Sequence, residues 1–196
     1  MHVGLIIYGS LDTISGGYLY DRKLVAHLRR QGDQVEVISL PWRSYPRHLG
    51  DNLSTGLLRR LENLSVDVLI QDELNHPSLF WINHRLRRQV NYPILSIVHH
   101  LRSSEARPGW QNWAYRWIES RYLESLDGFI FNSQVTRRAV TALLGGTPQH
   151  ARPSLVAYPA GDRFQPQIDP QAIARRALGS GPLQVLFLGN LIPRKG

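Results

Sequence analysis

The sequence predicts an α/β fold: a doubly wound, mostly parallel, Rossmann-like sheet with helices on both faces. Short runs of β-branched and aliphatic residues alternate at regular intervals with longer segments in which apolar residues recur every three or four positions. Most of the short runs are apolar almost throughout, as in strands that are buried on both faces. Repeated strand–helix units of this kind are typical of parallel sheets joined by crossover helices.

Each expected element follows from its own pattern. The apolar runs predict strands at residues 3–8, 34–39, 66–71, 94–98 and 128–131. The segments with helical spacing predict helices at residues 18–31, 54–64, 78–89, 110–126 and 133–144.

Beyond these units the chain becomes rich in Pro and Gly, which indicates a connection between domains with a short strand at 154–157. A short helix at 170–178 and a final strand beginning at Leu183 follow. We therefore expect one Rossmann-like domain over residues 1–180, linker included. Residues 181–196 are expected to form the first strand and basic loop of a second domain.

Composition narrows the function classes. The 196 residues are 42% hydrophobic, enough for one good-sized core, and contain no cysteine, which excludes disulfides and thiolate zinc sites. The longest apolar runs are too short to span a bilayer, so we expect a soluble, cytoplasmic protein, with peripheral contact at the inner membrane face left open. The net charge of +8 suits polyanions, phosphorylated small molecules and acidic membranes.

Ligands of doubly wound sheets bind at the carboxyl ends of the strands. Gly16 and Gly17 follow the first strand and come just before the first helix, where missing side chains let an anion approach the backbone N–H groups. The loop has neither the G-x-G-x-x-G fingerprint nor a phosphate-binding P-loop pattern. The alternative is an ordinary Gly-rich strand–helix connection.

His99 and His100 follow the fourth strand directly. A histidine at this edge can bind a sugar hydroxyl or a phosphate, or transfer a proton; the alternative is a structural pair that closes the strand. A metal site is not expected, because adjacent histidines at a strand exit point apart and no nearby carboxylate or cysteine completes a ligand set. Neither D-x-D nor G-x-S-x-G occurs in the chain.

The helix expected at 110–126 would carry Trp110, Trp113 and Trp117 on one face, because they are spaced i, i+3 and i+7. Ile118 and Tyr122 are expected to broaden this stripe. We expect the stripe to face the core. Two alternatives stay open because arginines are interspersed with the tryptophans. One is an interfacial helix at an acidic lipid surface. The other is contact with single-stranded nucleic acid, which the absence of any nucleic-acid module pattern disfavours.

Five segments, in chain order, resemble motifs of family 4 glycosyltransferases of the two-domain GT-B architecture. The segment SGGYLYDRKLVAHLRRQGDQVEVISL is similar to the family's first unit, in which two glycines precede a helix that ends in Gly and an apolar strand. VHHL resembles its V-H-[DH] after the fourth strand. ESLDGFIFNSQVTRRAV, YPAGDRFQP and FLGNLIPRKG are similar to its aD-x-(apolar)-x-S-x-x-x unit, its N-G-V-D…F-x-P linker and its x-G-R-L-x-x-x-K-G loop. The resemblance covers the whole chain and implies the N-terminal half of a GT-B fold.

This resemblance implies the retaining transfer of a hexose from a nucleotide diphosphate sugar, with no metal or other cofactor. The diphosphate would lie between Gly16, Gly17 and the basic loop, where Lys195 matches the family's lysine and Asn190 stands where an arginine is usual. His99 would contact the donor sugar as the catalytic histidine. The acceptor-side candidates are Tyr18, Asp21, His100 and Arg102.

The implied partners are a nucleotide sugar donor, a carbohydrate or lipid-linked acceptor and a C-terminal domain that would carry most of the donor site. We therefore expect this chain to be the acceptor half of a glycosyltransferase, inactive alone, with acceptor contacts from loops at 41–52 and 101–110. The physical requirement is that N–H dipoles and cations face the nucleoside diphosphate, which gains negative charge as it leaves. The alternative from another class is a non-catalytic binding module for an acidic membrane or nucleic acid.

Overall fold

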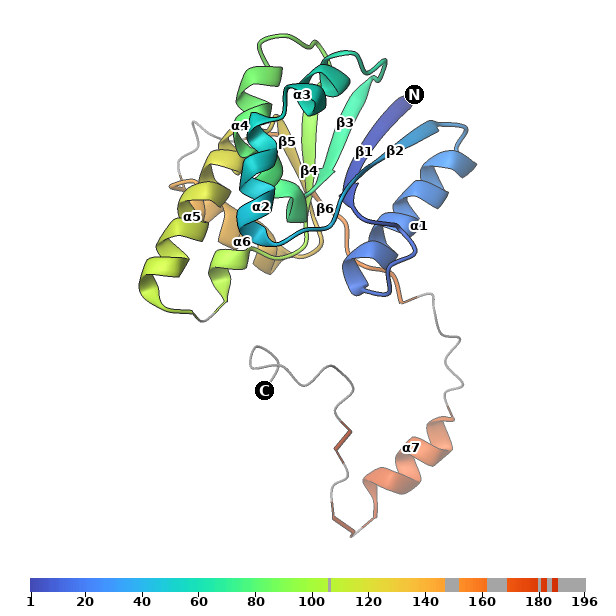
Figure 1. The fold of residues 1–196 in the computed structure, drawn as a ribbon. Coiled ribbons are helices and arrows are strands. Elements are labelled where there is room, and N and C mark those ends of the chain that lie inside the picture. The colour runs from blue at the N-terminus through green and yellow to red at the C-terminus, as the bar shows by residue number, and fades with distance from the viewer. Residues whose placement is uncertain (106, 147–151, 162–168, 180, 183–184, 187–196) are drawn as a thin grey trace. The chain divides into compact units, whose positions relative to one another are not determined.

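A single all-parallel sheet of six strands organises the computed structural model (Figure 1). The structure describes residues 1–105, 107–146, 152–161, 169–179, 181–182 and 185–186. The strand order is β2-β1-β3-β4-β5-β6. The strands are β1 (His2–Tyr8), β2 (Gln34–Leu40), β3 (Val68–Asp72), β4 (Ile94–Val98), β5 (Gly128–Phe131) and β6 (Ser154–Val156). The predicted fold class is confirmed.

The helices follow the strands in the expected alternation. They are α1 (Gly16–Arg30), α2 (Tyr45–Gly50), α3 (Thr55–Glu62), α4 (His76–Leu86), α5 (Gly109–Glu124), α6 (Gln134–Leu143) and α7 (Pro170–Ala177). In the described part of the chain, single 3₁₀ turns form three of the connections: η1 (Asp51–Leu53), η2 (Glu73–Asn75) and η3 (Arg102–Ser104). No helix in the described part of the chain is long and apolar enough to cross a bilayer.

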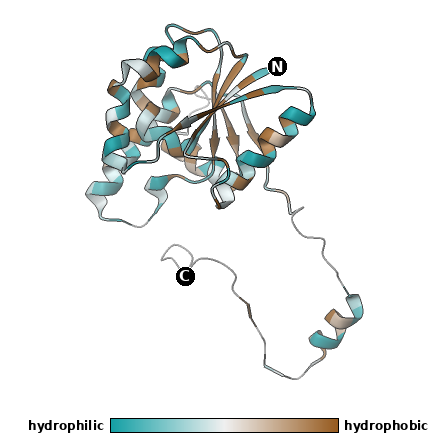
Figure 2. Cartoon of the chain, turned by 45° about the vertical axis from the view of Figure 1, so that its right-hand side comes forward, coloured by the Kyte–Doolittle hydropathy of each residue, from teal (hydrophilic) through white to brown (hydrophobic). Residues whose placement is uncertain are grey.

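Helices cover both faces of the sheet. On one face, Tyr18 and Val25 of α1 pack on alternate residues of the central strands. On the other, α3, α4, α5 and α6 contribute a larger cluster that includes Leu61, Ile82 and Tyr122. Figure 2 shows the hydrophobic residues concentrated along the strands between these layers. The sheet is therefore buried from both sides, which explains why most of its strands are continuously apolar in sequence.

The chain divides into two units, each described here by itself. The larger, Met1–Pro159, contains the sheet and α1 to α6. The second, Ala160–Gly196, contains α7, whose first turn is capped by Asp169: its carboxylate accepts a hydrogen bond of 2.9 Å from the N–H of Gln171. The strand expected from Leu183 falls largely on residues outside the described part of the chain. The domain boundary at residue 180 stays a prediction.

The expected core position of the tryptophan stripe is wrong. Trp110, Trp113 and Trp117 are 72%, 71% and 47% exposed, whereas Ile118 and Tyr122 of the same helix are buried. At 100° per residue the three tryptophans centre on the side of α5 roughly opposite to its buried side. The helix thus has two apolar faces, and spacing alone could not say which one the sheet covers.

The loop expected at 41–52 is also partly wrong, because it contains α2 and enters η1. Pro46 lies in the first turn of α2, where its missing N–H costs no hydrogen bond. His48 anchors the helix: it is buried and stacks on Tyr8 with ring centroids 4.0 Å apart. A helix of six residues is too short to show a periodic pattern in the sequence.

The closest backbone approach in the sheet yields a stability prediction. A Cβ on Gly128 would lie 2.8 Å from the carbonyl oxygen of Pro153, whereas a Cβ on Gly4 would lie 2.9 Å from a terminal methyl of Leu69, which can move. We expect Gly128→Ala to lower the free energy of unfolding by about 1–3 kcal/mol and Gly4→Ala to lower it less. Urea denaturation measures both, and equal losses would contradict this account of the β5–β6 contact.

Candidate functional site

The carboxyl ends of β1, β3 and β4 meet where the strand order reverses. The chain passes from β1 to β2 on one side of β1 and returns to β3 on its other side. At such a switch point the connections diverge and leave a crevice at the sheet edge. Asp72 ends β3 and His99 directly follows β4, so both lie at this edge together with the start of α1.

The N-terminus of α1 approaches His99 closely. Ser15 caps the helix, its hydroxyl accepting a 3.2 Å hydrogen bond from the N–H of Tyr18. A Cβ on Gly17 would lie 3.5 Å from Cδ2 of His99, so the imidazole packs directly on the backbone of the first turn. A Cβ on Gly16 would meet nothing within 4 Å. The structure therefore brings Gly16, Gly17 and His99 to one edge of the sheet, as the sequence predicted.

The backbone of His99 is held from the neighbouring strand. Asn132, after β5, donates through Nδ2 to the carbonyl oxygen of His99 at 3.0 Å. The ring edge of Tyr20, on α1, contacts the imidazole at a centroid distance of 5.2 Å. Contacts from α1 and from the β5–α6 connection therefore fix both the position and the tilt of this ring.

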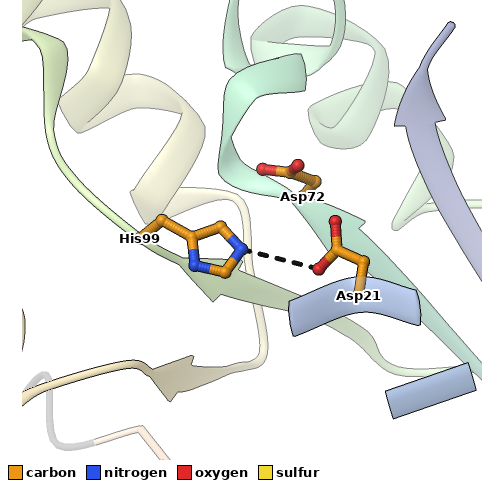
Figure 3. A group of neighbouring side chains, drawn as sticks. All are labelled: Asp21, Asp72 and His99. Carbon is orange, nitrogen blue, oxygen red and sulfur yellow. Dashed lines mark ion pairs between the residues drawn. The ribbon is translucent and has the colours of Figure 1, made fainter. Parts of the chain in front are cut away.

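Two buried carboxylates face His99 (Figure 3). Nε2 of His99 is 3.5 Å from Oδ1 of Asp21, and Asp21 and Asp72 are fully buried. Beyond this ion pair, neither oxygen of Asp21 has a hydrogen-bond partner in the described part of the chain. Oδ1 of Asp72 accepts from the N–H of Leu74 at 2.9 Å, but its Oδ2 is buried and has no hydrogen-bond partner among the same residues.

The environment shifts the ionisation of this cluster. Burial, and then the charge of Asp21, raise the pKa of Asp72 to about 8. Burial alone would lower the pKa of His99, but Asp21, Asp72 and Glu73 outweigh it and raise that pKa above its ordinary value. The arrangement therefore favours the charged form of the His99 imidazole and the protonated form of Asp72.

The expectation from the sequence that no carboxylate lies close enough to complete a metal-ligand set with His99 is wrong. One ligand atom each from Asp21, Asp72 and His99 lies within 4.8 Å of the others, so the three could hold a metal ion. The carboxylates were missed because Asp21 precedes Asp72 by 51 positions, and Asp72 precedes His99 by a further 27. That the protein needs no metal stays a prediction.

A second polar cluster lies beside the first. Nδ1 of His76 is 3.3 Å from Oε1 of Glu73, and its Nε2 is 3.1 Å from the hydroxyl of Tyr45. Oε1 of Glu119, on α5, accepts from the backbone N–H of Arg102 at 2.5 Å. Burial raises the pKa of Glu73 to about 8, raises that of Glu119 and lowers that of His76. Glu73, His76 and Glu119 also have ligand atoms within 4.8 Å of one another.

The acceptor-side candidates lie in different surroundings. Tyr18 is buried, and its hydroxyl donates to the carbonyl oxygen of Tyr8 at 2.6 Å. The guanidinium of Arg102 lies over two rings, 4.9 Å from the centroid of Tyr45 and 4.8 Å from that of Tyr115. Nε2 of His100 is 3.6 Å from a carboxylate oxygen of Glu105. The roles of Tyr18, Asp21, His100 and Arg102 at the acceptor stay predictions.

Two donor-side predictions cannot be placed, because Asn190 and Lys195 lie outside the described residues. Four buried groups near the site were missed as functional candidates: Asp72, Glu73, His76 and Glu119. The first three stand in the run QDELNH, which directly follows a buried strand. Such a polar run at a strand exit was a usable signal, whereas Glu119 lies in the middle of a helix and gave none.

Comparison with known proteins gives one family. The glycosyl transferase 4-like domain family matches residues 16–179, which is most of the chain. None of the curated proteins compared with the sequence matches it significantly. The matched region begins at the first residue of α1 and includes Asp21, Asp72 and His99.

The buried carboxyl of Glu73 gives a testable pH dependence. Its pKa is about 8 in the folded chain and near 4.5 without burial, so between these values the unfolded chain releases a proton that the folded chain keeps. The free energy of unfolding should therefore fall as pH rises through this window, by about 1.4 kcal/mol per pH unit per proton. Glu73→Gln removes the group, and we expect its unfolding free energy to fall less steeply in urea titrations from pH 5 to 8.

The matched control is Glu124→Gln, which changes an exposed carboxylate on α5. Its pH profile should follow that of the unaltered chain. If Glu73→Gln has the same slope as Glu124→Gln, Glu73 is ionised in the folded chain and the account of its burial fails.

Proposed function

The chain belongs to the glycosyl transferase 4-like domain family, and from this premise we propose that it binds a nucleoside diphosphate hexose and serves its retaining transfer to a carbohydrate or lipid-linked acceptor. The sheet edge at β1, β3 and β4 is the proposed binding site. In the transfer, the bond between the sugar's anomeric carbon and the diphosphate oxygen breaks, the acceptor hydroxyl oxygen takes its place, and the proton of that hydroxyl passes to the leaving diphosphate. The negative charge that develops on the leaving diphosphate is the charge the site must stabilise.

The contact between Gly17 and His99 carries this proposal. The first turn of α1 presents backbone N–H groups with no side chain at positions 16 and 17, and the positive end of the helix dipole favours an anion there. A Cβ on Gly17 would touch the imidazole at 3.5 Å, so a diphosphate at this turn would have its sugar within reach of His99. We assign Gly16 and Gly17 to the diphosphate and His99 to the hexose.

The proposal includes a second domain that completes the donor site. In the glycosyltransferase family that the sequence resembles, the diphosphate also contacts a lysine and an arginine. Lys195 and Asn190 stand at these positions here. Two helix-terminal N–H groups alone leave much of the diphosphate charge in water. We therefore propose that these 196 residues bind a nucleotide sugar weakly and do not complete the transfer by themselves.

Filling the turn at Gly17 should weaken donor binding. We expect Gly17→Val to reduce affinity for a nucleoside diphosphate hexose at least about tenfold, a change of about 1.4 kcal/mol, because the new side chain would press on the His99 imidazole and cover the N–H groups of the first turn. Titration with UDP-, GDP- and ADP-hexoses, followed by NMR shifts of the Gly16 and Gly17 amides and the His99 imidazole, measures this.

Gly56→Val is the matched control, because Gly56 is the second residue of α3 as Gly17 is of α1. It should bind like the unaltered chain. Equal loss of affinity in the two variants, or shifts that avoid α1 and His99, would contradict the proposed site. Turnover of a nucleotide hexose by this chain alone would contradict the proposal that a second domain is required.

A second function, peripheral binding to an acidic membrane, is favoured by the exposure of the tryptophans of α5. Trp110 and Trp113 are each more than two-thirds exposed, and Arg121 lies 5.8 Å from the ring of Trp117. Tryptophan favours the boundary between water and lipid, where arginine meets anionic headgroups. The two functions are compatible if the acceptor is a lipid.

The double variant Trp110→Ser, Trp113→Ser should weaken binding to vesicles of phosphatidylcholine and phosphatidylglycerol about tenfold, which corresponds to about 1.4 kcal/mol. Added salt should weaken it further, and pure phosphatidylcholine should bind less. Trp42→Ser is the control, since Trp42 is 64% exposed but follows β2. If the double variant still binds vesicles as the unaltered chain does, the proposal that the tryptophans of α5 bind the membrane is wrong. If the tryptophans are needed for binding to a single-stranded oligonucleotide but not to vesicles, the ligand of this surface is nucleic acid.

A further inference from the structure

The geometry points to Asp21 as a positioning residue for His99: its carboxylate holds the Nε2 side of the imidazole as a counter-ion and leaves Nδ1 to the ligand. This proposal rests on the proposed function only for the identity of the ligand, the hexose or diphosphate of a nucleotide sugar.

The first step is that His99 is the only partner of the Asp21 carboxylate among the described residues. Its side chain is fully buried in the first two turns of α1, and Nε2 of His99 is 3.5 Å from its Oδ1. Apart from this pair, neither carboxylate oxygen has a hydrogen-bond partner in the described residues. A buried carboxylate without a counter-charge is strongly unfavourable. The imidazole therefore supplies the counter-charge of Asp21 through an ion pair, and Asp21 in turn fixes which ring nitrogen faces inward.

The second step concerns Asp72. Its Oδ1 is engaged by the N–H of Leu74, while its buried Oδ2 has no partner among the described residues. Ligand atoms of Asp21, Asp72 and His99 lie within 4.8 Å of one another. Two carboxylates this close in a dry site cannot both ionise, so one of them keeps a proton. Burial and the charge of Asp21 raise the pKa of Asp72, which makes Asp72 the group that keeps it.

The third step is the charge balance around the ring. The groups that act on His99 are Asp21 from α1, Asp72 from β3, Glu73 from η2 and the uncharged ring of Tyr20 from α1. The three carboxyl groups among them raise the pKa of His99 despite its burial. A protonated imidazole held at Nε2 offers Nδ1–H as a charge-assisted donor, which suits a phosphate oxygen or sugar hydroxyl.

The decisive experiment compares Asp21→Asn with Asp72→Asn. Each variant removes one carboxylate from the same cluster and keeps the side-chain size. We expect Asp21→Asn to lower the pKa of His99 by about one unit or more, measured by NMR titration of its ring nitrogens, and to shift the Nε2–H tautomer population. Asp72→Asn replaces a group that is already neutral at neutral pH, so it should leave the tautomer unchanged and shift the titration less.

The same variants are then titrated with the nucleoside diphosphate hexose that binds best. Affinity should fall as pH rises through the pKa of His99, and the fall should occur at lower pH in Asp21→Asn. Thermal denaturation verifies that both variants are folded. A merely structural role of Asp21 would change stability without moving this pH profile.

The proposal is overturned if the His99 titration is the same in Asp21→Asn as in the unaltered chain, or if Asp72→Asn shifts it more. It is also overturned if the chain binds Zn²⁺ or Mn²⁺ one to one and Asp21→Asn abolishes this, because the cluster would then be a metal site. The NMR titration needs no ligand. Its failure is therefore distinct from failure of the proposed function, which shows as an absence of nucleotide-sugar binding with the His99 titration intact.

Discussion

The close approach of α1 to the imidazole of His99 is the contact on which the candidate site depends. Gly17 leaves the ring directly against the helix backbone, and Ser15 fixes where that helix begins. The parallel sheet makes this approach possible, because it collects the ends of β1, β3 and β4 at one edge. A ligand bound at this edge would meet the helix N–H groups and the imidazole next to each other.

Behind this contact lie more buried ionisable groups than stability alone would favour. Asp21, Asp72, Glu73 and Glu119 are all buried, and burial raises the pKa of Asp72 and Glu73 to about 8. Such groups destabilise a fold unless partners compensate them, and strongly shifted pKa values cluster at functional sites. We infer that the fold tolerates this cost at the sheet edge because it holds His99 in one orientation and charge state.

Helix α5, which contains Glu119, has a buried side near the candidate site and an exposed side that carries tryptophans. One side of α5 packs on the sheet through Ile118 and Tyr122, and the hydroxyl of Tyr122 donates to Ser96 at 3.0 Å. The opposite side exposes Trp110 and Trp113. The first side supports the buried cluster, and the second is exposed.

The sequence by itself determined the order and type of nearly every element, and with them the alternation of strands and helices. It also determined that Gly16, Gly17 and His99 lie at strand ends. These depend on local periodicity and on which residues follow a strand, and both are readable along the chain. Only the tertiary structure decided that Asp21 and Asp72 meet His99, because sheet order, rather than distance along the chain, brings them together. It also decided which apolar side of α5 is covered, since helical spacing defines a face but not the layer that packs against it.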